Sequence, residues 1–216
     1  MPKHNEGVVA SNQKDIAPGL SESGNVGVWT DNELMQAIAE ADTEAFALLM
    51  GRHVPTMTAL ARRITLNFHD ADEVVQEAFL RVWTHAPRWR ADGPAQFRTW
   101  LQRIVTNLAI DRCRKPKALP LEAAGDPPDP ARDAESGLQA QDEARIIREA
   151  MARLPEHQRA AIALYYFDEM SAAQVAEVLD KTVGSTEVLL TRARHALRSL
   201  LTNKGFIGKE KGGHNE

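Results

Sequence analysis

Apolar residues recur at intervals of three and four along the first half of the chain, which is the spacing of one face of an α-helix. The pattern predicts helices that begin near positions 30, 42, 56, 70 and 96, the last three ending near 67, 85 and 114. Thr30 with Glu33 has the form of a capping box, and Asp70 is a good N-cap. Pro87 and Pro116 mark ends, because proline interrupts helical hydrogen bonding. No strand-like alternation is present, so this half is predicted to be all-α.

Helical spacing resumes at 138 and predicts a helix to the break at Leu154-Pro155, then a helix over 156–167. Ser171 can cap a short helix that runs to Leu179, and Ser185 can cap a longer one that runs to about 201. A short helix, a tight turn and a longer helix are typical of a helix-turn-helix. The same pattern also fits a plain α-hairpin in a bundle.

Three segments lack any periodicity. Residues 1–29 are rich in Gly, Ser, Asn and Pro and are predicted to be a disordered arm, and 203–216 a flexible tail. Residues 116–137 hold five prolines and an excess of carboxylates, the composition of a flexible acidic linker. We therefore expect two small helical domains, 30–115 and 138–202, that move independently about this linker.

Composition bounds the function further. The net charge of −4 excludes a generally basic nucleic-acid binder, so any DNA contact has to come from local patches. The one cysteine, Cys113, cannot form an internal disulfide, and no stretch of about 18 apolar residues occurs. We expect a cytoplasmic protein without membrane insertion. Cys113 is read as a small buried hydrophobe, with redox sensing as the alternative.

The predicted helix over 70–85 has two distinct faces. An apolar stripe, with Phe79 in it, is expected to be buried. Another face carries carboxylates around one apolar residue and could dock on a basic partner helix; it consists of Asp72, Glu73, Gln76, Glu77 and Leu80. Taken alone, this face could equally be solvated surface.

The segment 88–117 is locally basic, with eight Arg and Lys residues against two Asp, or a net +6. Trp89 and Trp100 lie among these bases. Arginine beside aromatic rings suits single-stranded nucleic acid, because the guanidinium binds phosphate while the aromatic ring stacks on a nucleobase. Arg103, Asn107 and Arg114 share the more open face of the predicted helix. Trp100 could instead be a core residue.

The sequence shows no clear motif for metal binding, phosphate binding or catalysis. The seven histidines show no metal-ligand spacing, and the glycines near the C-terminus lack the spacing of a phosphate-binding loop. No nucleophile, base and orienting group can be proposed together. We expect neither an enzyme nor a bound cofactor or metal.

Three motifs resemble one family, the extracytoplasmic-function (ECF) group of bacterial RNA polymerase sigma factors. The segment DEVVQEAFLRVW at 72–83 is similar to the family's polymerase-docking helix, and FRTWLQRIVTNLAID at 97–111 to the helix that reads and melts the −10 promoter element. Leu154-Pro155 with Gln158-Arg159, and Arg192-Ala193-Arg194 further on, resemble the domain that reads the −35 element.

The resemblance implies partners and residue roles. The partners would be promoter DNA, the core polymerase through the coiled coil of its largest subunit and its flap, and a cognate anti-sigma factor. The implied polymerase-binding residues are Asp72, Gln76, Glu77 and Leu80. The implied −10 residues are Arg88, Trp89, Arg90, Arg103, Asn107 and Arg114. The implied −35 residues are Ser185, Thr186, Glu187, Leu190, Thr191, Arg192 and Arg194.

The sequence departs from the family at two positions and in one loop. Asp180 replaces the usual glycine after the first helix of the helix-turn-helix, which Asp tolerates because it can adopt left-handed backbone angles. Glu187 stands where many members are basic, and the loop over 88–96 is about two residues longer than in compact members. Two rival functions are a stand-alone helix-turn-helix regulator and a decoy that binds an anti-sigma factor. Neither accounts for both DNA surfaces.

Overall fold

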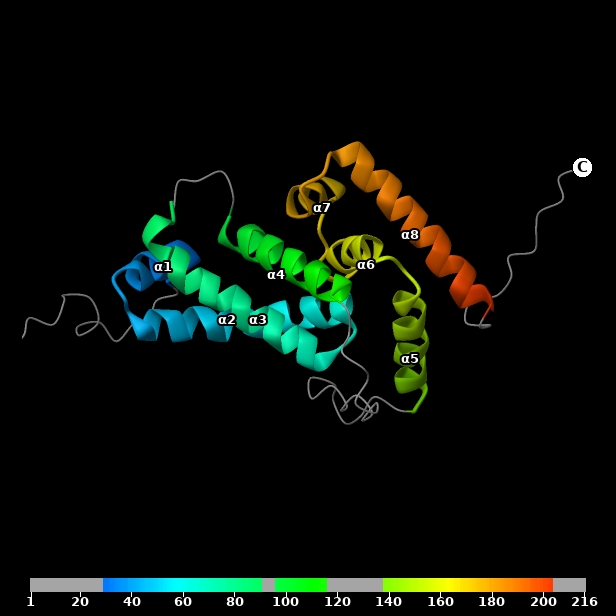
Figure 1. The fold of residues 1–216 in the computed structure, drawn as a ribbon, viewed down its shortest axis with the longest axis horizontal. Helices are drawn as coiled ribbons and strands as arrows, with labels where there is room; N and C mark the ends of the chain where they lie inside the picture. The colour runs from blue at the N-terminus through cyan, green and yellow to red at the C-terminus, as the bar shows by residue number, and fades with distance from the viewer. Residues whose placement is uncertain (1–28, 91–95, 116–137, 204–216) are drawn as a thin grey trace, which may run out of the picture.

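All regular structure in the described part of the chain is helical (Figure 1). The computed structural model describes residues 29–90, 96–115 and 138–203, so most of the predicted arm, the linker and the tail lie outside it. The elements are α1 (Asp31–Ala39), α2 (Thr43–Thr65), α3 (Phe68–His85), η1 (Ala86–Arg88), α4 (Phe97–Arg114), α5 (Leu138–Ala152), α6 (Glu156–Ile162), η2 (Ala163–Phe167), α7 (Ala172–Leu179) and α8 (Val183–Asn203). The expected all-α class is confirmed.

Helices α1 to α4 form the N-terminal module. The capping box of Thr30 and Glu33 is present at α1. The predicted break before Thr56 is wrong, because α2 runs through Pro55 without interruption. Buried residues recur every fourth position on both sides of that proline, so tertiary packing of one continuous face outweighs the lost hydrogen bond.

The start of α3 also differs from the prediction. Asn67, not Asp70, is the N-cap: its side-chain oxygen accepts from the Asp70 backbone N–H at 2.9 Å. The Asp70 carboxylate instead accepts from Arg112 of α4 at 2.8 Å. At the other end α3 stops at His85, and Pro87 lies in the following 3₁₀ turn, as expected.

Helices α5 to α8 form the C-terminal module, and its helix-turn-helix is α7 and α8. Ser171 caps α7 as predicted, and Asp180 adopts left-handed angles (φ 54°, ψ 49°) in the turn. The predicted cap of α8 is wrong. The helix begins at Val183, and the hydroxyl of Thr182 accepts from the Ser185 backbone N–H at 3.2 Å.

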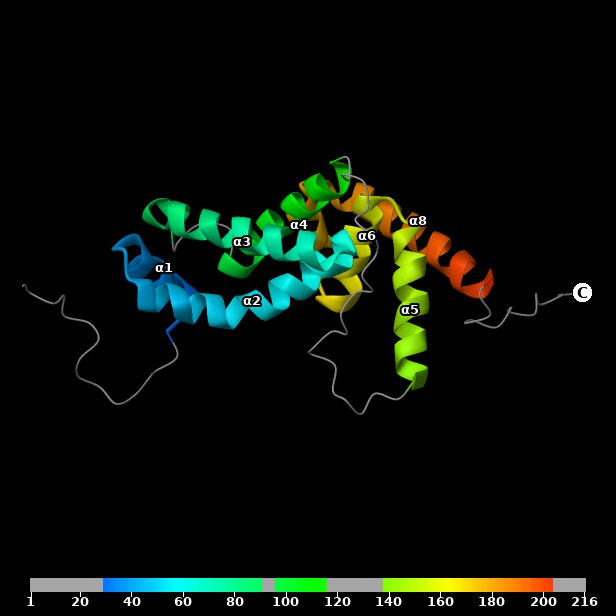
Figure 2. The ribbon, with the colours of Figure 1, turned by 60° about the horizontal axis from the view of Figure 1, so that its bottom comes forward.

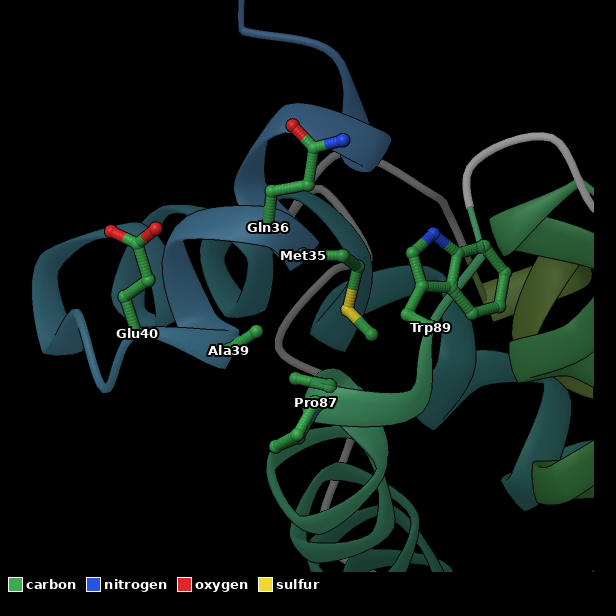
Figure 3. Close-up of a pocket in the computed structure, with 7 residues that line it drawn as sticks. Met35, Gln36, Ala39, Glu40, Pro87 and Trp89 are labelled. Atoms are coloured by element: carbon green, nitrogen blue, oxygen red, sulfur yellow. The ribbon is translucent and has the colours of Figure 1, made fainter.

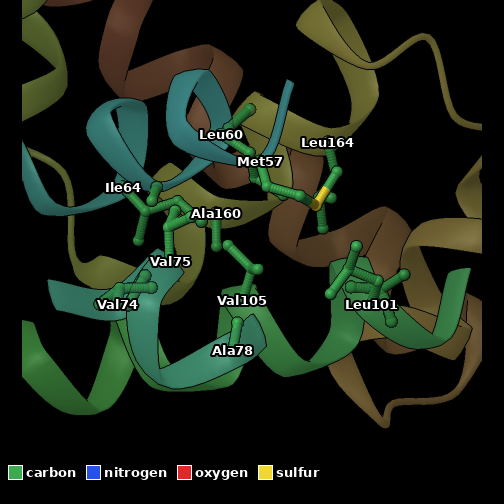
Figure 4. Packing of buried hydrophobic residues seen from close by; sticks show 14 of the residues in the cluster. Met57, Leu60, Ile64, Val74, Val75, Ala78, Leu101, Val105, Ala160 and Leu164 are labelled. Atoms are coloured by element: carbon green, nitrogen blue, oxygen red, sulfur yellow. The ribbon is translucent and has the colours of Figure 1, made fainter. Parts of the chain in front are cut away.

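The two modules pack against each other, which contradicts the expected independence. Helix α6 contacts α2 and α4, and α7 contacts α4 (Figures 1 and 2). One buried apolar cluster includes Met57, Leu60 and Val105 of the first module together with Ala160 and Leu164 of the second (Figure 4). The linker composition gave no sign of this, because the contact is made by the helices themselves, through apolar side chains and through ion pairs such as Arg103–Asp180. We call this contact surface the seam.

The described helices include none that is long and apolar enough to span a membrane. Those same residues also contain no group of three or more His, Cys, Asp or Glu side chains placed to hold a metal ion.

Candidate nucleic-acid interfaces and docking face

The predicted docking face lies on the outside of α3. Asp72, Gln76, Glu77 and Leu80 are all exposed, and Leu80 is 58% exposed. The expected apolar stripe of α3 is buried on the opposite side and includes Phe79. The four residues therefore form one accessible strip along the helix.

The strip is anionic and only loosely paired within the chain. Glu77 accepts from Arg81 at 3.0 Å, one turn further along α3, and Asp72 lies 3.8 Å from Arg62 of α2. Exposed pairs of this kind contribute little to stability. Their carboxylates can therefore turn to a basic partner at small cost, while Leu80 supplies apolar contact.

Aromatic rings gather where η1 meets the start of α4. The centroid of Trp89 lies 5.2 Å from that of Trp100 and 5.7 Å from that of Phe97. The indole N–H of Trp89 donates to Asn32 of α1 at 3.0 Å, and Trp89 is half-buried. Trp89 is thus held in place by these contacts rather than lying free in a polar loop. Trp100 is also half-buried, so it is neither a full core residue nor a fully exposed one.

A pocket of about 300 Å³ opens beside Trp89, between α1 and η1 (Figure 3). Its lining combines apolar side chains with a larger share of polar surface, to which Gln36 and Glu40 contribute; the remaining lining residues are Met35, Ala39, Ala86, Pro87 and Trp89. A planar apolar body with a hydrogen-bonding edge, such as a nucleobase, matches this chemistry.

The predicted −10 face of α4 is only partly accessible. Arg103, Asn107 and Arg114 are exposed, as are Arg88 and Arg90 before the helix. Across the seam, however, Arg103 lies 3.2 Å from the Asp180 carboxylate, and Arg114 donates to Glu156 at 3.0 Å. Two of these predicted DNA residues are therefore paired with the second module.

The predicted −35 residues divide into two groups on α8. Ser185, Glu187, Thr191, Arg192 and Arg194 are exposed. Thr186 and Leu190 are 0% and 3% exposed, and face the core. Their prediction as DNA contacts is corrected, because a side chain buried within its own module cannot reach a base edge. Both side chains pack α8 against the rest of its module.

Val188 and Arg63 were not identified from the sequence, and Arg98 was counted there only among the eight bases of 88–117. Val188 is 50% exposed on α8 and could contact a thymine methyl group. Arg63 and Arg98 both face Asp168, the first 3.9 Å away and the second near enough to favour its ionised form. The periodicity of α8 could have separated Val188 from Leu190, but the clustering of the two arginines depends on tertiary packing.

Cys113 lies inside the seam rather than on an open surface. Its Sγ donates to the Ile64 carbonyl at 3.4 Å and accepts from Arg159 at 3.5 Å. Burial raises the pKa of the Cys113 thiol, and the nearby Arg159 offsets part of that rise. A raised thiol pKa leaves little thiolate at neutral pH, which favours the structural reading over redox sensing.

Both modules match sigma-factor family models. Residues 49–118 match sigma-70 region 2, and residues 144–197 match sigma-70 region 4. The chain is 32% identical over 182 residues to the ECF RNA polymerase sigma factor SigW of Bacillus subtilis, covering 77% of this chain and 94% of SigW. It is 30% identical over 184 residues to the ECF RNA polymerase sigma-E factor of Escherichia coli K12, covering 78% and 92%.

Solved structures show the same fold. CnrH, determined in complex with the cytosolic domain of CnrY, superposes with a TM-score of 0.60 at 27% identity, covering 80% of this chain and 97% of CnrH. RpoE of Bartonella quintana, determined with the anti-sigma factor NepR, gives a TM-score of 0.55 at 20% identity, covering 73% and 96%.

Proposed function

The chain belongs to the ECF RNA polymerase sigma factors, and we propose on that premise that its three exposed faces divide the work of promoter recognition. The α3 strip binds the coiled coil of the polymerase's largest subunit. The region around Trp89 and α4 reads and opens the −10 element, and α8 reads the −35 element. The observation that supports this most is the α3 strip, where an exposed leucine among acidic groups lies opposite a fully packed face.

The −10 surface would act by trapping an unpaired base. Flipping a base out of the duplex costs a few kcal/mol, which stacking in a fixed site can offset. Trp89 is held by Asn32 and by two aromatic neighbours, so little freedom is lost when a base stacks on it. The pocket of Figure 3 offers a matching recess. Arg88, Arg90 and Asn107 would hold the strand that carries this base.

The −35 surface would present the exposed residues of α8 to the major groove. Arg192 and Arg194 suit phosphates, and Glu187 can accept from cytosine N4. Thr191 already accepts from Arg194 at 3.3 Å, which fixes the orientation of that guanidinium. A cytosine opposite Glu187 is therefore part of the proposed −35 preference.

Both surfaces would bind promoter DNA productively only while the chain is bound to core polymerase. Docking fixes the two modules relative to promoter DNA, and tethering makes the second contact effectively intramolecular, a gain of roughly 10²–10⁴ in avidity. The chain itself would carry no catalytic centre and would work in the cytoplasm. A cognate anti-sigma factor would be a further partner, by analogy with RpoE and NepR.

The test is reconstituted initiation. Transcripts that increase after overexpression identify a shared promoter, and run-off transcription from it is then measured with core polymerase, with this protein and with both. Transcripts are expected only from the mixture. The double variant Gln76→Ala with Glu77→Ala should lose them while keeping its circular dichroism spectrum. Tight promoter binding and regulation without any polymerase contact would instead identify a stand-alone regulator.

A further inference from the structure

One face of α1 presents a row of polar side chains to the region of Trp89. Asn32, Gln36 and the C-cap residue Glu40 follow one another at intervals of four, so they lie along the same face of the helix. Asn32 accepts from the indole N–H of Trp89 at 3.0 Å. Gln36 and Glu40 line the pocket beside that ring (Figure 3). The helix that holds the tryptophan therefore also supplies two polar groups to the recess next to it.

The side chains of Gln36 and Glu40 are available to a ligand. Both are exposed, and neither makes a hydrogen bond or an ion pair with any residue that the structure describes. The other carboxylates of α1 are already engaged, because Asp31 pairs with Arg52 of α2 and Glu33 closes the capping box. Glu40 is thus the carboxylate of this helix that is left to bind something else.

The space in front of these groups suits a flat ring. The pocket has a volume of about 300 Å³, and the small side chain of Ala39 leaves it open between the polar groups. Met35, which is 0% exposed, lines it from the core, and Figure 3 shows the Met35 thioether between α1 and Trp89. A base in this space meets the Trp89 ring together with the polar ends of Gln36 and Glu40.

Charge decides which part of a nucleotide faces α1. The segment 31–40 holds three carboxylates and no Arg or Lys, so it repels phosphate. Arg88 and Arg90, on either side of Trp89 in the chain, are exposed and suit phosphate. The sugar–phosphate backbone is therefore expected beside the arginines, and the uncharged base is the part that points toward α1.

We propose that Gln36 and Glu40 read the edge of the unpaired −10 base that stacks beside Trp89, and that they select a base with an exocyclic amino group over thymine. This inference rests on the proposed function of the Trp89 region and names the base that it takes. Both residues lie outside the segments whose sequence resembles promoter-reading elements of the family.

The preference follows from the hydrogen-bonding groups on each side. A carboxylate only accepts, whereas a glutamine amide both donates and accepts. Cytosine and adenine present an amino donor beside a ring nitrogen that accepts, which matches Glu40 with Gln36, and guanine presents two neighbouring donors. Thymine offers a single N–H between two carbonyl oxygens, and these oxygens repel a carboxylate. Glu40 therefore acts against thymine as well as for the amino-bearing bases.

Base substitution in fork-junction DNA measures this preference. Each unpaired non-template position of the mapped −10 element carries each of the four bases in turn, and the equilibrium binding of polymerase holoenzyme that contains this protein is recorded. With the wild type we expect one position at which thymine binds roughly fivefold or more weakly than the amino-bearing bases, the lower end of the range for a good base contact.

Variants assign the effect to the pocket. Glu40→Gln supplies an amide that thymine can also pair with, and should reduce the discrimination to about twofold or less. Glu44→Gln removes an exposed carboxylate from the first turn of α2, outside the pocket, and should leave it unchanged. Gln36→Ala should weaken binding of the cytosine and adenine templates. Ala39→Leu fills the recess and should weaken binding of every base at that position.

The outcomes separate this inference from the proposed function. Thymine bound as tightly as the other bases at every unpaired position, or equal effects of Glu40→Gln and Glu44→Gln, would overturn the base reading. If Trp89→Ala and Ala39→Leu weaken binding while Glu40→Gln keeps the discrimination, the Trp89 region binds promoter DNA and the role of Glu40 is wrong. If Trp89→Ala and Ala39→Leu bind every template like the wild type, with unchanged circular dichroism, the proposed −10 function of this surface is wrong too.

Discussion

Phe79 and Leu80 are adjacent in α3 and lie about 100° apart around its axis, so that only Phe79 faces the core. The Phe79 ring is buried with its centroid 6.3 Å from that of Phe46, whereas more than half of Leu80 is exposed. One residue therefore supports the fold, and its neighbour is available to a partner.

Alanine substitutions should separate these two roles. Phe79→Ala removes a buried ring and should lower the free energy of unfolding by about 3–5 kcal/mol. Leu80→Ala should change it by less than about 0.5 kcal/mol, yet weaken binding to core polymerase. Urea unfolding and a polymerase-binding titration check the two quantities. If Leu80→Ala binds core polymerase like the wild type, the strip is solvated surface.

Thr186→Val should stabilise the protein without changing its promoter preference. The Thr186 hydroxyl is buried without a hydrogen-bond partner, so an apolar group of the same shape removes a desolvation cost of about 1 kcal/mol or more. Thermal unfolding measures the gain, and selection of preferred −35 sequences measures specificity. An altered preference would show that Thr186 contacts DNA after all.

Glu187→Lys should change the preferred −35 sequence, because Lys cannot accept from cytosine N4. The alternative role of Glu187 is a favourable charge near the start of α8. Selection from a randomised −35 library, run with the polymerase holoenzyme, decides between them. Unchanged preference and unchanged general affinity, alongside a small loss of stability, would leave only the helix-end role.

The contribution of Asp168 to folding stability should fall as pH rises above the ordinary pKa of Asp. Burial raises the Asp168 pKa from 3.8, while Gln102 and the two arginines Arg63 and Arg98 offset part of the rise. The folded protein therefore binds this proton more tightly than the unfolded chain does. The proton's contribution to the free energy of unfolding is fully present below about 3.8 and is lost as pH rises through the raised pKa.

Urea unfolding at a series of pH values reports this change. The contribution of Asp168 to the free energy of unfolding should decrease with pH across that window. Asp168→Asn should flatten the profile, and an unchanged profile in that variant would assign the pH dependence to another group.

Local sequence signals predicted the elements well where one side chain decides the outcome. The N-cap at Ser171 and the left-handed Asp180 are examples, since each depends on a few adjacent residues. The exposed strip on α3 was equally predictable from the sequence, because helical periodicity alone separates Leu80 from Phe79.

Tertiary packing accounts for the features that the sequence did not predict correctly. A separate helix was expected from about Thr56, but the buried stripe on both sides of Pro55 keeps α2 continuous. Gln102 is polar and was not expected in a core, and only the arrival of Asp168 from the second module explains its burial. The seam joins residues more than forty positions apart, so no local pattern could reveal it.

The central claim is that this chain opens promoter DNA only as a subunit of RNA polymerase. Permanganate footprinting of a mapped target promoter tests it most directly, with the protein alone, with core polymerase alone and with both. The account predicts reactive thymines near the start site only in the mixture. Asn107→Ala should weaken that signal without loss of core binding. Reactive thymines with the protein alone, or none with the mixture, would contradict it.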